Sequence, residues 1–173
     1  MSSLPGRAQK YAKQAHVGQL RKYTREPYIN HPAEVVELVR TVPYTEAMLA
    51  AAWLHDIVED TPIQLDEIER VFGSEVASLV DSLTDISKPS DGNRKTRKAL
   101  DLEHTAKASS AAKTIKLADL ISNSLSIATH DPKFAKVYLP EKAALLEVLT
   151  EGNSSLLAKA KELLNVLARQ ETS

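Results

Sequence analysis

The sequence contains no cysteine, only five glycines among its 173 residues, and few aromatic side chains (5%). The lack of cysteine excludes disulfides and thiolate metal sites, so a transition metal would have to use histidine and carboxylate ligands. Few glycines and few runs of β-branched residues argue against an all-β fold. The formal net charge is −1, so no overall field would draw the protein to nucleic acid or to an anionic membrane.

Long hydrophobic runs are also missing. No segment approaches the length of a membrane span, and residues 1–10 lack the apolar core of a signal peptide. We therefore expect a cytoplasmic protein with neither a membrane nor a nucleic acid as partner. A chain of 173 residues with 43% hydrophobic content is expected to form one domain with a substantial core. The sequence does not indicate an oligomeric state.

Helical periodicity runs through almost the whole chain and predicts an all-α fold of roughly eight helices. Thr45 is the expected N-cap of the third helix, Gly73 a stop signal, and residues 87–95 the clearest loop. The expected helices cover residues 7–17, 32–42, 46–60, 65–72, 75–83, 96–108 and 111–129, a short segment that starts at Pro140, and residues 154–170.

Four ionisable residues follow the apolar stretch of the third helix: His55, Asp56, Glu59 and Asp60. The apolar residues occupy nearly all sides of this helix, so it should be mostly buried, and buried charge is costly unless it is paired or binds a metal. Glu59 and Asp60 also fall in the last expected turn, where the helix dipole disfavours anions. The pattern favours a metal site at His55 and Asp56, with two carboxylates one turn later that can act on water.

Further ligands for such a metal must come from elsewhere in the chain. His31 stands at a helix start, and Asp119 lies within an apolar helix, where a lone carboxylate is costly. Asn123 shares the helix face of Asp119. The alternatives are that His31 only makes hydrogen bonds at the helix start, and that Asp119 pairs with Lys116.

The remaining histidines have simpler interpretations. His16, near a helix end, is expected to make a local hydrogen bond, and His104 should lie on the surface of a charged helix. His130 suits the negative end of a helix dipole. Taken alone, Glu59 and Asp60 would be read as an exposed acidic turn, so the metal hypothesis rests on the joint pattern.

These residues resemble a known family. His31, then His55–Asp56, then Asp119 is similar to the H…HD…D signature of the HD-domain phosphohydrolases. The sequence also resembles, in the same order, the hydrolase domain of the RelA/SpoT alarmone enzymes and their small stand-alone relatives, including the metazoan form. The similar core extends from about residue 7 to about residue 150. The segments that carry the resemblance are residues 18–22, 26–32, 54–61 and 115–119.

The resemblance implies a single all-helical HD domain over residues 1–173, with a further helix at about 154–170. It implies that Glu59 and Asp60 position and activate a water molecule. The expected reaction is hydrolysis of the 3′-pyrophosphate of a small nucleotide such as ppGpp, with release of pyrophosphate. The implied cofactor is one Mn²⁺ ion, bound by His31, His55, Asp56 and Asp119.

Three residues are expected to bind the nucleotide by the same resemblance: Arg21 against the base, Lys22 near phosphate and Asn123 near the ribose. The alternative for Arg21 and Lys22 is a solvated basic loop. Residues 23–25 and 120–122 differ from the family pattern, which leaves the choice between guanosine and adenosine substrates, ppGpp and ppApp, open. Two other functions remain: an HD phosphohydrolase acting on a nucleoside 5′-monophosphate, and a non-catalytic nucleotide-binding helical module.

Overall fold

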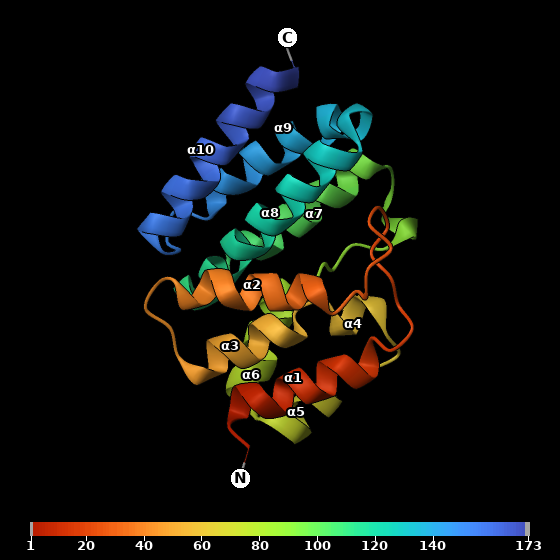
Figure 1. Ribbon diagram of the computed structural model, residues 1–173, viewed down its shortest axis with the longest axis vertical. Coiled ribbons are helices and arrows are strands. Elements are labelled where there is room, and N and C mark those ends of the chain that lie inside the picture. The colour runs from red at the N-terminus through yellow and green to blue at the C-terminus, as the bar shows by residue number, and fades with distance from the viewer. Residues whose placement is uncertain (1, 172–173) are drawn as a thin grey trace. The chain divides into compact units, whose positions relative to one another are not determined.

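The computed structural model describes residues 2–171, and this part of the chain contains ten α-helices and one short 3₁₀-helix (Figure 1). The predicted all-α fold is confirmed, although with more helices than expected. The chain divides into two compact units between Thr84 and Asp85, and each is described by itself. The single domain predicted from the sequence stays a prediction. In the described residues, no helix is both long and apolar enough to cross a membrane.

The first unit is organised around its third helix, which contacts α1, α2 and α6. Figure 1 shows this helix between α1 and α2. Residues 47–54 are all buried, as the apolar residues on every side of the helix predict. The helices of the unit are α1 (Leu4–Ala15), α2 (Asn30–Arg40), α3 (Glu46–Leu54), α4 (Ile57–Asp60), α5 (Leu65–Phe72) and α6 (Ser74–Leu83).

Two predicted helix boundaries of this unit are confirmed. The Thr45 side chain accepts a hydrogen bond from the backbone N–H of Met48 (3.2 Å), as an N-cap does. Gly73 has φ 92° and joins α5 to α6, so the sharp turn between these helices uses backbone angles that glycine adopts at little cost.

The predicted continuous helix over residues 46–60 is wrong. The third helix ends at Leu54, and a separate single turn, α4, begins at Ile57. Asp56 has φ −100° and ψ 0°, in the sparsely populated region between helix and strand. Glu59 and Asp60 therefore do not continue the buried helix, and both are exposed. These two carboxylates therefore avoid the cost of burying charge that the continuous helix would have imposed.

A short hairpin over residues 19–28 connects α1 to α2. Leu20 and Pro27 form an antiparallel bridge, and the N–H of Tyr28 donates to the carbonyl of Gln19 (2.9 Å). At its tip, Arg25 has φ 62°, a left-handed conformation that is uncommon for a residue other than glycine. The hairpin carries both basic residues predicted to bind the nucleotide.

The second unit is built around its longest helix, α8, which contacts α9 and α10, while α7 contacts α9. The predicted loop over residues 87–95 contains the 3₁₀-helix, and α7 begins two residues earlier than expected, at Arg94. The elements of the unit are η1 (Pro89–Asp91), α7 (Arg94–Ala106), α8 (Ser110–His130), α9 (Pro132–Val148) and α10 (Ser154–Glu171).

The predicted start of a helix at Pro140 is wrong, because Pro140 lies inside α9. This helix begins at Pro132, where the missing proline N–H costs little, and the Asp131 side chain caps it by accepting from the N–H of Phe134 (3.1 Å). The start of α10 at Ser154 is confirmed, with Asn153 as the capping side chain.

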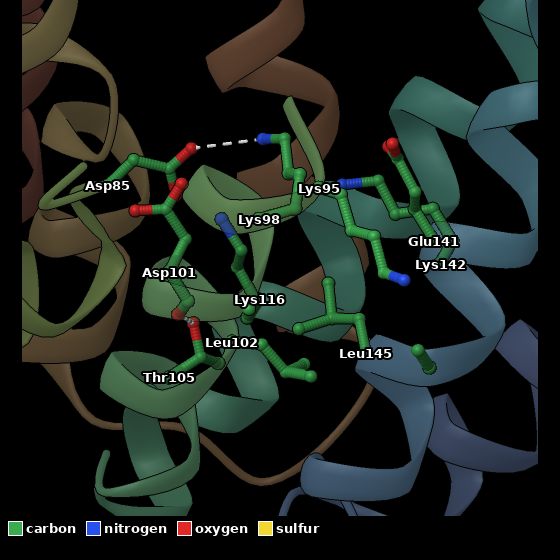
Figure 2. A pocket seen from close by; sticks show the side chains of 12 residues that line it. Asp85, Lys95, Lys98, Asp101, Leu102, Thr105, Lys116, Glu141, Lys142 and Leu145 are labelled. Carbon is green, nitrogen blue, oxygen red and sulfur yellow. Dashed lines mark hydrogen bonds and ion pairs between the residues drawn. The ribbon is translucent and has the colours of Figure 1, made fainter. Parts of the chain in front are cut away.

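A cavity of about 340 Å³ lies within the second unit, lined by side chains of α7 and α9, by Lys116 of α8 and by Asp85 (Figure 2). Its walls combine apolar residues such as Leu102 and Leu145 with several lysines. Burial, together with the nearby positive charge of Lys116, lowers the pKa of Lys142 to about 8. The ammonium of Lys142 lies 4.9 Å from the centre of the Tyr138 ring.

Candidate metal centre

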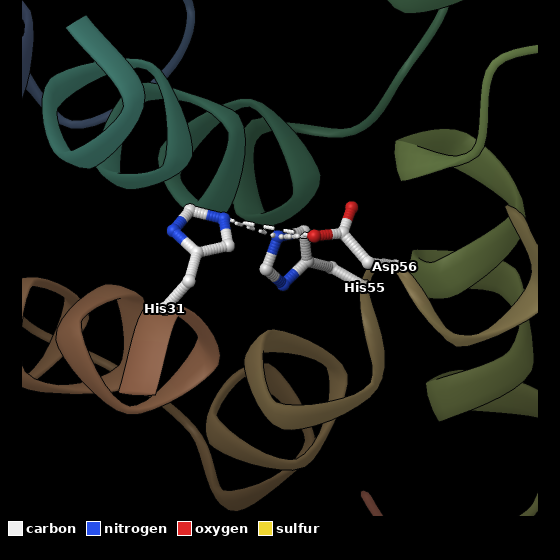
Figure 3. Close-up of side chains that lie close together, drawn as sticks. All are labelled: His31, His55 and Asp56. Atoms are coloured by element: carbon white, nitrogen blue, oxygen red, sulfur yellow. Dashed lines mark hydrogen bonds and ion pairs between the residues drawn. The ribbon is translucent and has the colours of Figure 1, made fainter. Parts of the chain in front are cut away.

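The structure brings His31, His55 and Asp56 together. One possible ligand atom from each lies within 4.8 Å of the others, and Figure 3 shows both rings turned toward the carboxylate. Oδ2 of Asp56 is 3.0 Å from Nε2 of His55 and 3.6 Å from Nε2 of His31. The two Nε2 atoms are 3.3 Å apart. Among the described residues this is the one group of three or more histidine or acidic side chains so arranged.

Local structure explains how these side chains meet. His31 occupies the first turn of α2, just before Pro32, which fixes the backbone there. His55 directly follows the buried α3, and Asp56 occupies the break before α4. Both histidines are buried, and Asp56 is half-buried. Consecutive residues on a continuous helix point about 100° apart, so the break lets His55 and Asp56 face the same point.

The hydrogen bonding of His55 suits a metal ligand. Its Nδ1 lies 2.8 Å from the carbonyl oxygen of Ala52, which can only accept, so Nδ1 carries the proton. The lone pair of Nε2 is then directed at His31 and Asp56. Two imidazole nitrogens and a carboxylate oxygen that converge in a buried place fit a divalent cation, which would satisfy all three.

The two candidate water-activating residues lie in α4, directly after the group. Asp60 is exposed overall, yet partial burial of its carboxyl raises its pKa, and the negative charge of Asp56 raises it further. The Tyr28 hydroxyl and the nearby His16 and His55 act in the opposite direction. A carboxylate with a raised pKa accepts a proton more readily than an ordinary one.

The hairpin places the two candidate nucleotide-binding residues in different environments. Nη1 of Arg21 donates to Oε1 of Glu34 (2.6 Å), so its guanidinium is held in place and its side chain is largely buried. Lys22 is exposed, and its ammonium lies 5.1 Å from the centre of the Tyr23 ring.

Asp119 and Asn123 belong to the second unit. Oδ1 of Asp119 accepts a hydrogen bond from Nδ2 of Asn123 (2.8 Å), which confirms that they share a helix face. Oδ2 of Asp119 lies 3.6 Å from Nζ of Lys116, the pairing considered as its alternative role. Asp119 is buried. Its predicted role as a metal ligand, and that of Asn123 toward a ribose, stay predictions.

The structure adds two residues that sequence reasoning did not connect with the metal group. His16 makes the predicted local contact, with Nδ1 2.8 Å from Oε1 of Gln19, but its ring also packs 4.9 Å from that of Tyr28. The Tyr28 hydroxyl donates to Oδ2 of Asp56. No local signal marks such a contact between residues far apart in the sequence. The other two histidines meet expectation: His104 is half-exposed and His130 exposed.

Comparison with known proteins defines the class. The sequence profile of the HD domain matches residues 8–166, so the chain belongs to the HD domain family.

Two relatives with named activities are similar to this chain. The chain is 38% identical over 125 residues to a guanosine-3′,5′-bis(diphosphate) 3′-pyrophosphohydrolase of Drosophila melanogaster, a match that covers 70% of this chain and 68% of that protein. It is 50% identical over 78 residues to a probable enzyme of the same name from Synechocystis, covering 45% of this chain but only 10% of the longer relative.

Two solved structures are similar to this chain in fold. The fold is similar to that of a metazoan SpoT orthologue described as hydrolysing ppGpp, with a TM-score of 0.84, 31% identity, and coverage of 95% of this chain and 96% of the other. A Listeria monocytogenes protein, 23% identical with a TM-score of 0.66 over 80% of this chain and 99% of the other, shares the fold.

Proposed function

We propose that this protein is a metal-dependent nucleotide 3′-pyrophosphohydrolase that removes pyrophosphate from an alarmone of the ppGpp type. The observation that carries the proposal is the convergence of His31, His55 and Asp56 on one point. Similarity to the Drosophila enzyme and to the metazoan SpoT orthologue supports the reaction and the substrate class.

The proposed cofactor is Mn²⁺, bound by the three converging side chains and by Asp119. The donor set supports this choice, because imidazole and carboxylate ligands without thiolate suit such a cation. The chemistry that a divalent cation supplies when bound is a lower pKa for nearby water and compensation of charge on the phosphoryl oxygens.

The proposed reaction breaks the bond between the ribose 3′ oxygen and the adjacent phosphorus. Asp60, with Glu59 beside it, takes a proton from a water molecule as the water oxygen attacks that phosphorus. The leaving 3′ oxygen takes up the proton that Asp60 removed from the water, so one water is consumed, a 3′ hydroxyl and pyrophosphate are formed, and Asp60 returns to its carboxylate form. The raised pKa of Asp60 supports its assignment as the proton acceptor. General-base catalysis of this kind typically contributes ~10²–10⁴-fold.

The proposed nucleotide contacts use Arg21 against the base, Lys22 near phosphate and Asn123 near the ribose. The ion pair between Arg21 and Glu34 supports the first role, since it holds the guanidinium plane in place for stacking. The substrate assay compares the guanosine substrate ppGpp with the adenosine substrate ppApp. A cytoplasmic location and the absence of nucleic-acid partners also stay predictions.

The test is pyrophosphate release from ppGpp and from ppApp, with and without added Mn²⁺. We expect turnover of at least one, dependence on the metal, and loss of turnover in Glu59→Gln and Asp60→Asn with metal binding retained. Orthophosphate release from a nucleoside 5′-monophosphate would instead identify the other kind of HD phosphohydrolase. No turnover of any nucleotide with Mn²⁺ demonstrably bound would reject an enzyme and favour the binding module.

A further inference from the structure

The hairpin over residues 19–28 contacts the turn of the metal group at both of its ends. Nε2 of Gln19 donates to the carbonyl oxygen of Asp60 (3.0 Å), and the Tyr28 hydroxyl donates to the side chain of Asp56. Gln19 and Tyr28 are joined to each other by the backbone hydrogen bond that closes the hairpin (2.9 Å). The N–H of Asp60 donates in turn to the carbonyl of Asp56 (2.9 Å). These bonds form a closed ring around the turn.

The Tyr28 hydroxyl lies beside two carboxyl groups, those of Asp56 and Asp60, and it opposes the rise of the Asp60 pKa. It donates to Oδ2 of Asp56, the same atom that lies 3.0 Å from Nε2 of His55 and 3.6 Å from Nε2 of His31. An aspartate carboxylate turns easily about its terminal torsion, which has only broad preferences. A donor aimed at Oδ2 therefore fixes the rotation that directs this oxygen at the two histidines.

The ring that carries this hydroxyl is itself held in place. Its centre lies 4.9 Å from that of His16 and 5.9 Å from that of His31. His16 is 3% exposed, and its Nδ1 lies 2.8 Å from Oε1 of Gln19. His16 thus braces both anchoring side chains of the hairpin, which gives this buried histidine a role beyond a local hydrogen bond.

We propose that Tyr28 is a positioning residue for the metal, whose hydroxyl orients Asp56 as a ligand, and that the His16–Gln19 pair holds the same turn at Asp60. The inference rests on the metal site of the proposed function. Hydrogen-bond partners of metal ligands typically contribute about 10–100-fold to metal affinity. A purely structural hydroxyl would affect folding stability without this effect.

The first experiment compares Tyr28→Phe with Tyr11→Phe in the full chain. Tyr11 is a matched control, because its hydroxyl donates to the carboxylate of Glu67 in the same unit and neither residue belongs to the metal group. Mn²⁺ affinity is measured by titration calorimetry, and the stability of the metal-free protein by urea unfolding. We expect Tyr28→Phe to weaken Mn²⁺ binding about 10-fold or more, and Tyr11→Phe to leave it unchanged.

The outcomes separate this inference from the proposed function. Affinity within twofold of wild type in Tyr28→Phe, or equal weakening in both variants, would overturn the role of Tyr28. Neither result depends on hydrolysis of any nucleotide. A wild-type chain that binds no divalent cation would overturn the metal site and this inference together, whereas failure to hydrolyse ppGpp with normal Mn²⁺ binding would leave the inference standing.

A second variant tests the other anchor. Gln19→Ala removes the hydrogen bond to the Asp60 carbonyl and the contact with Nδ1 of His16, and neither involves the side chain of a candidate ligand. We expect unchanged Mn²⁺ affinity and a kcat lower by ~10-fold with KM unchanged, since a small displacement of a catalytic group is enough for such a loss. Unchanged kcat would remove the anchor at Asp60 from the inference. Reduced metal affinity would contradict the separate roles of the two anchors.

Discussion

Lys142 should make the protein less stable near neutral pH than it would be without the lysine. Burial in the cavity of the second unit lowers its pKa from 10.5 to about 8, with Lys116 and Lys98 acting in the same direction and Asp119 and Asp85 opposing them. The folded state therefore disfavours the charged form. At pH 7 the lysine is protonated both folded and unfolded, and the difference in pKa corresponds to about 3 kcal/mol of destabilisation.

Replacing Lys142 by methionine keeps the length of the side chain and removes the charge. The contact of the ammonium with the Tyr138 ring is lost, which costs about 0.5–1 kcal/mol. We therefore expect Lys142→Met to raise the free energy of unfolding at pH 7 by about 2 kcal/mol. Urea unfolding followed by circular dichroism measures this directly.

The pH dependence gives a second, independent check. As pH rises above 8, the folded lysine loses its proton while the unfolded one keeps it until about pH 10.5, so the penalty fades over this range. Between pH 7 and pH 9.5 the gap between variant and wild type should narrow by about 2 kcal/mol. Lys95→Met is the control, because Lys95 lines the same cavity but is exposed. A variant no more stable than wild type at pH 7, or a gap constant with pH, would refute the reasoning.

Three further predictions concern buried and catalytic carboxylates. Asp101 accepts hydrogen bonds from the N–H groups of Ile86 and Ser87 (3.0 and 2.9 Å), so Asp101→Ala should lower the free energy of unfolding by about 2–4 kcal/mol in urea titrations, through unsatisfied donors. Asp60→Asn should reduce pyrophosphate release by ~10²–10⁴-fold with Mn²⁺ affinity retained, and parallel loss of both would argue against the general-base role. Asp119→Ala should lower Mn²⁺ occupancy in elemental analysis, and full occupancy would remove Asp119 from the ligand set.

The sequence predicted best those features that depend on local pattern. The apolar residues on every side of α3 indicated its burial, and Thr45 marked its start, because a cap needs only a side chain and a nearby N–H. His31, His55 and Asp56 were also predicted together. The expected continuous helix up to Asp60 was wrong, since no glycine or proline near His55 and Asp56 marks the break between α3 and α4.

Features that depend on contacts between distant residues could not be predicted from the sequence. Tyr28 reaches Asp56 across 28 positions, and nothing in its immediate neighbours indicates the contact. Lys142 is on a helix that looked short from Pro140, and its environment depends on α7 and α8 as much as on its own helix. The helix start predicted at Pro140 was wrong. Proline favours the first turn of a helix, but Asp131 and Pro132 supply a stronger start signal, and α9 begins eight residues earlier.

The hairpin over residues 19–28 joins two tasks in one short piece of chain. It carries Arg21 and Lys22, proposed to bind the nucleotide, and it touches Asp56 and Asp60 through its two ends. Under the proposed function, a nucleotide that binds to the hairpin and fixes its position also fixes the positions of the side chains at the cation site. Thermodynamic linkage then requires reciprocity: the cation should tighten nucleotide binding by the same factor by which the nucleotide tightens cation binding.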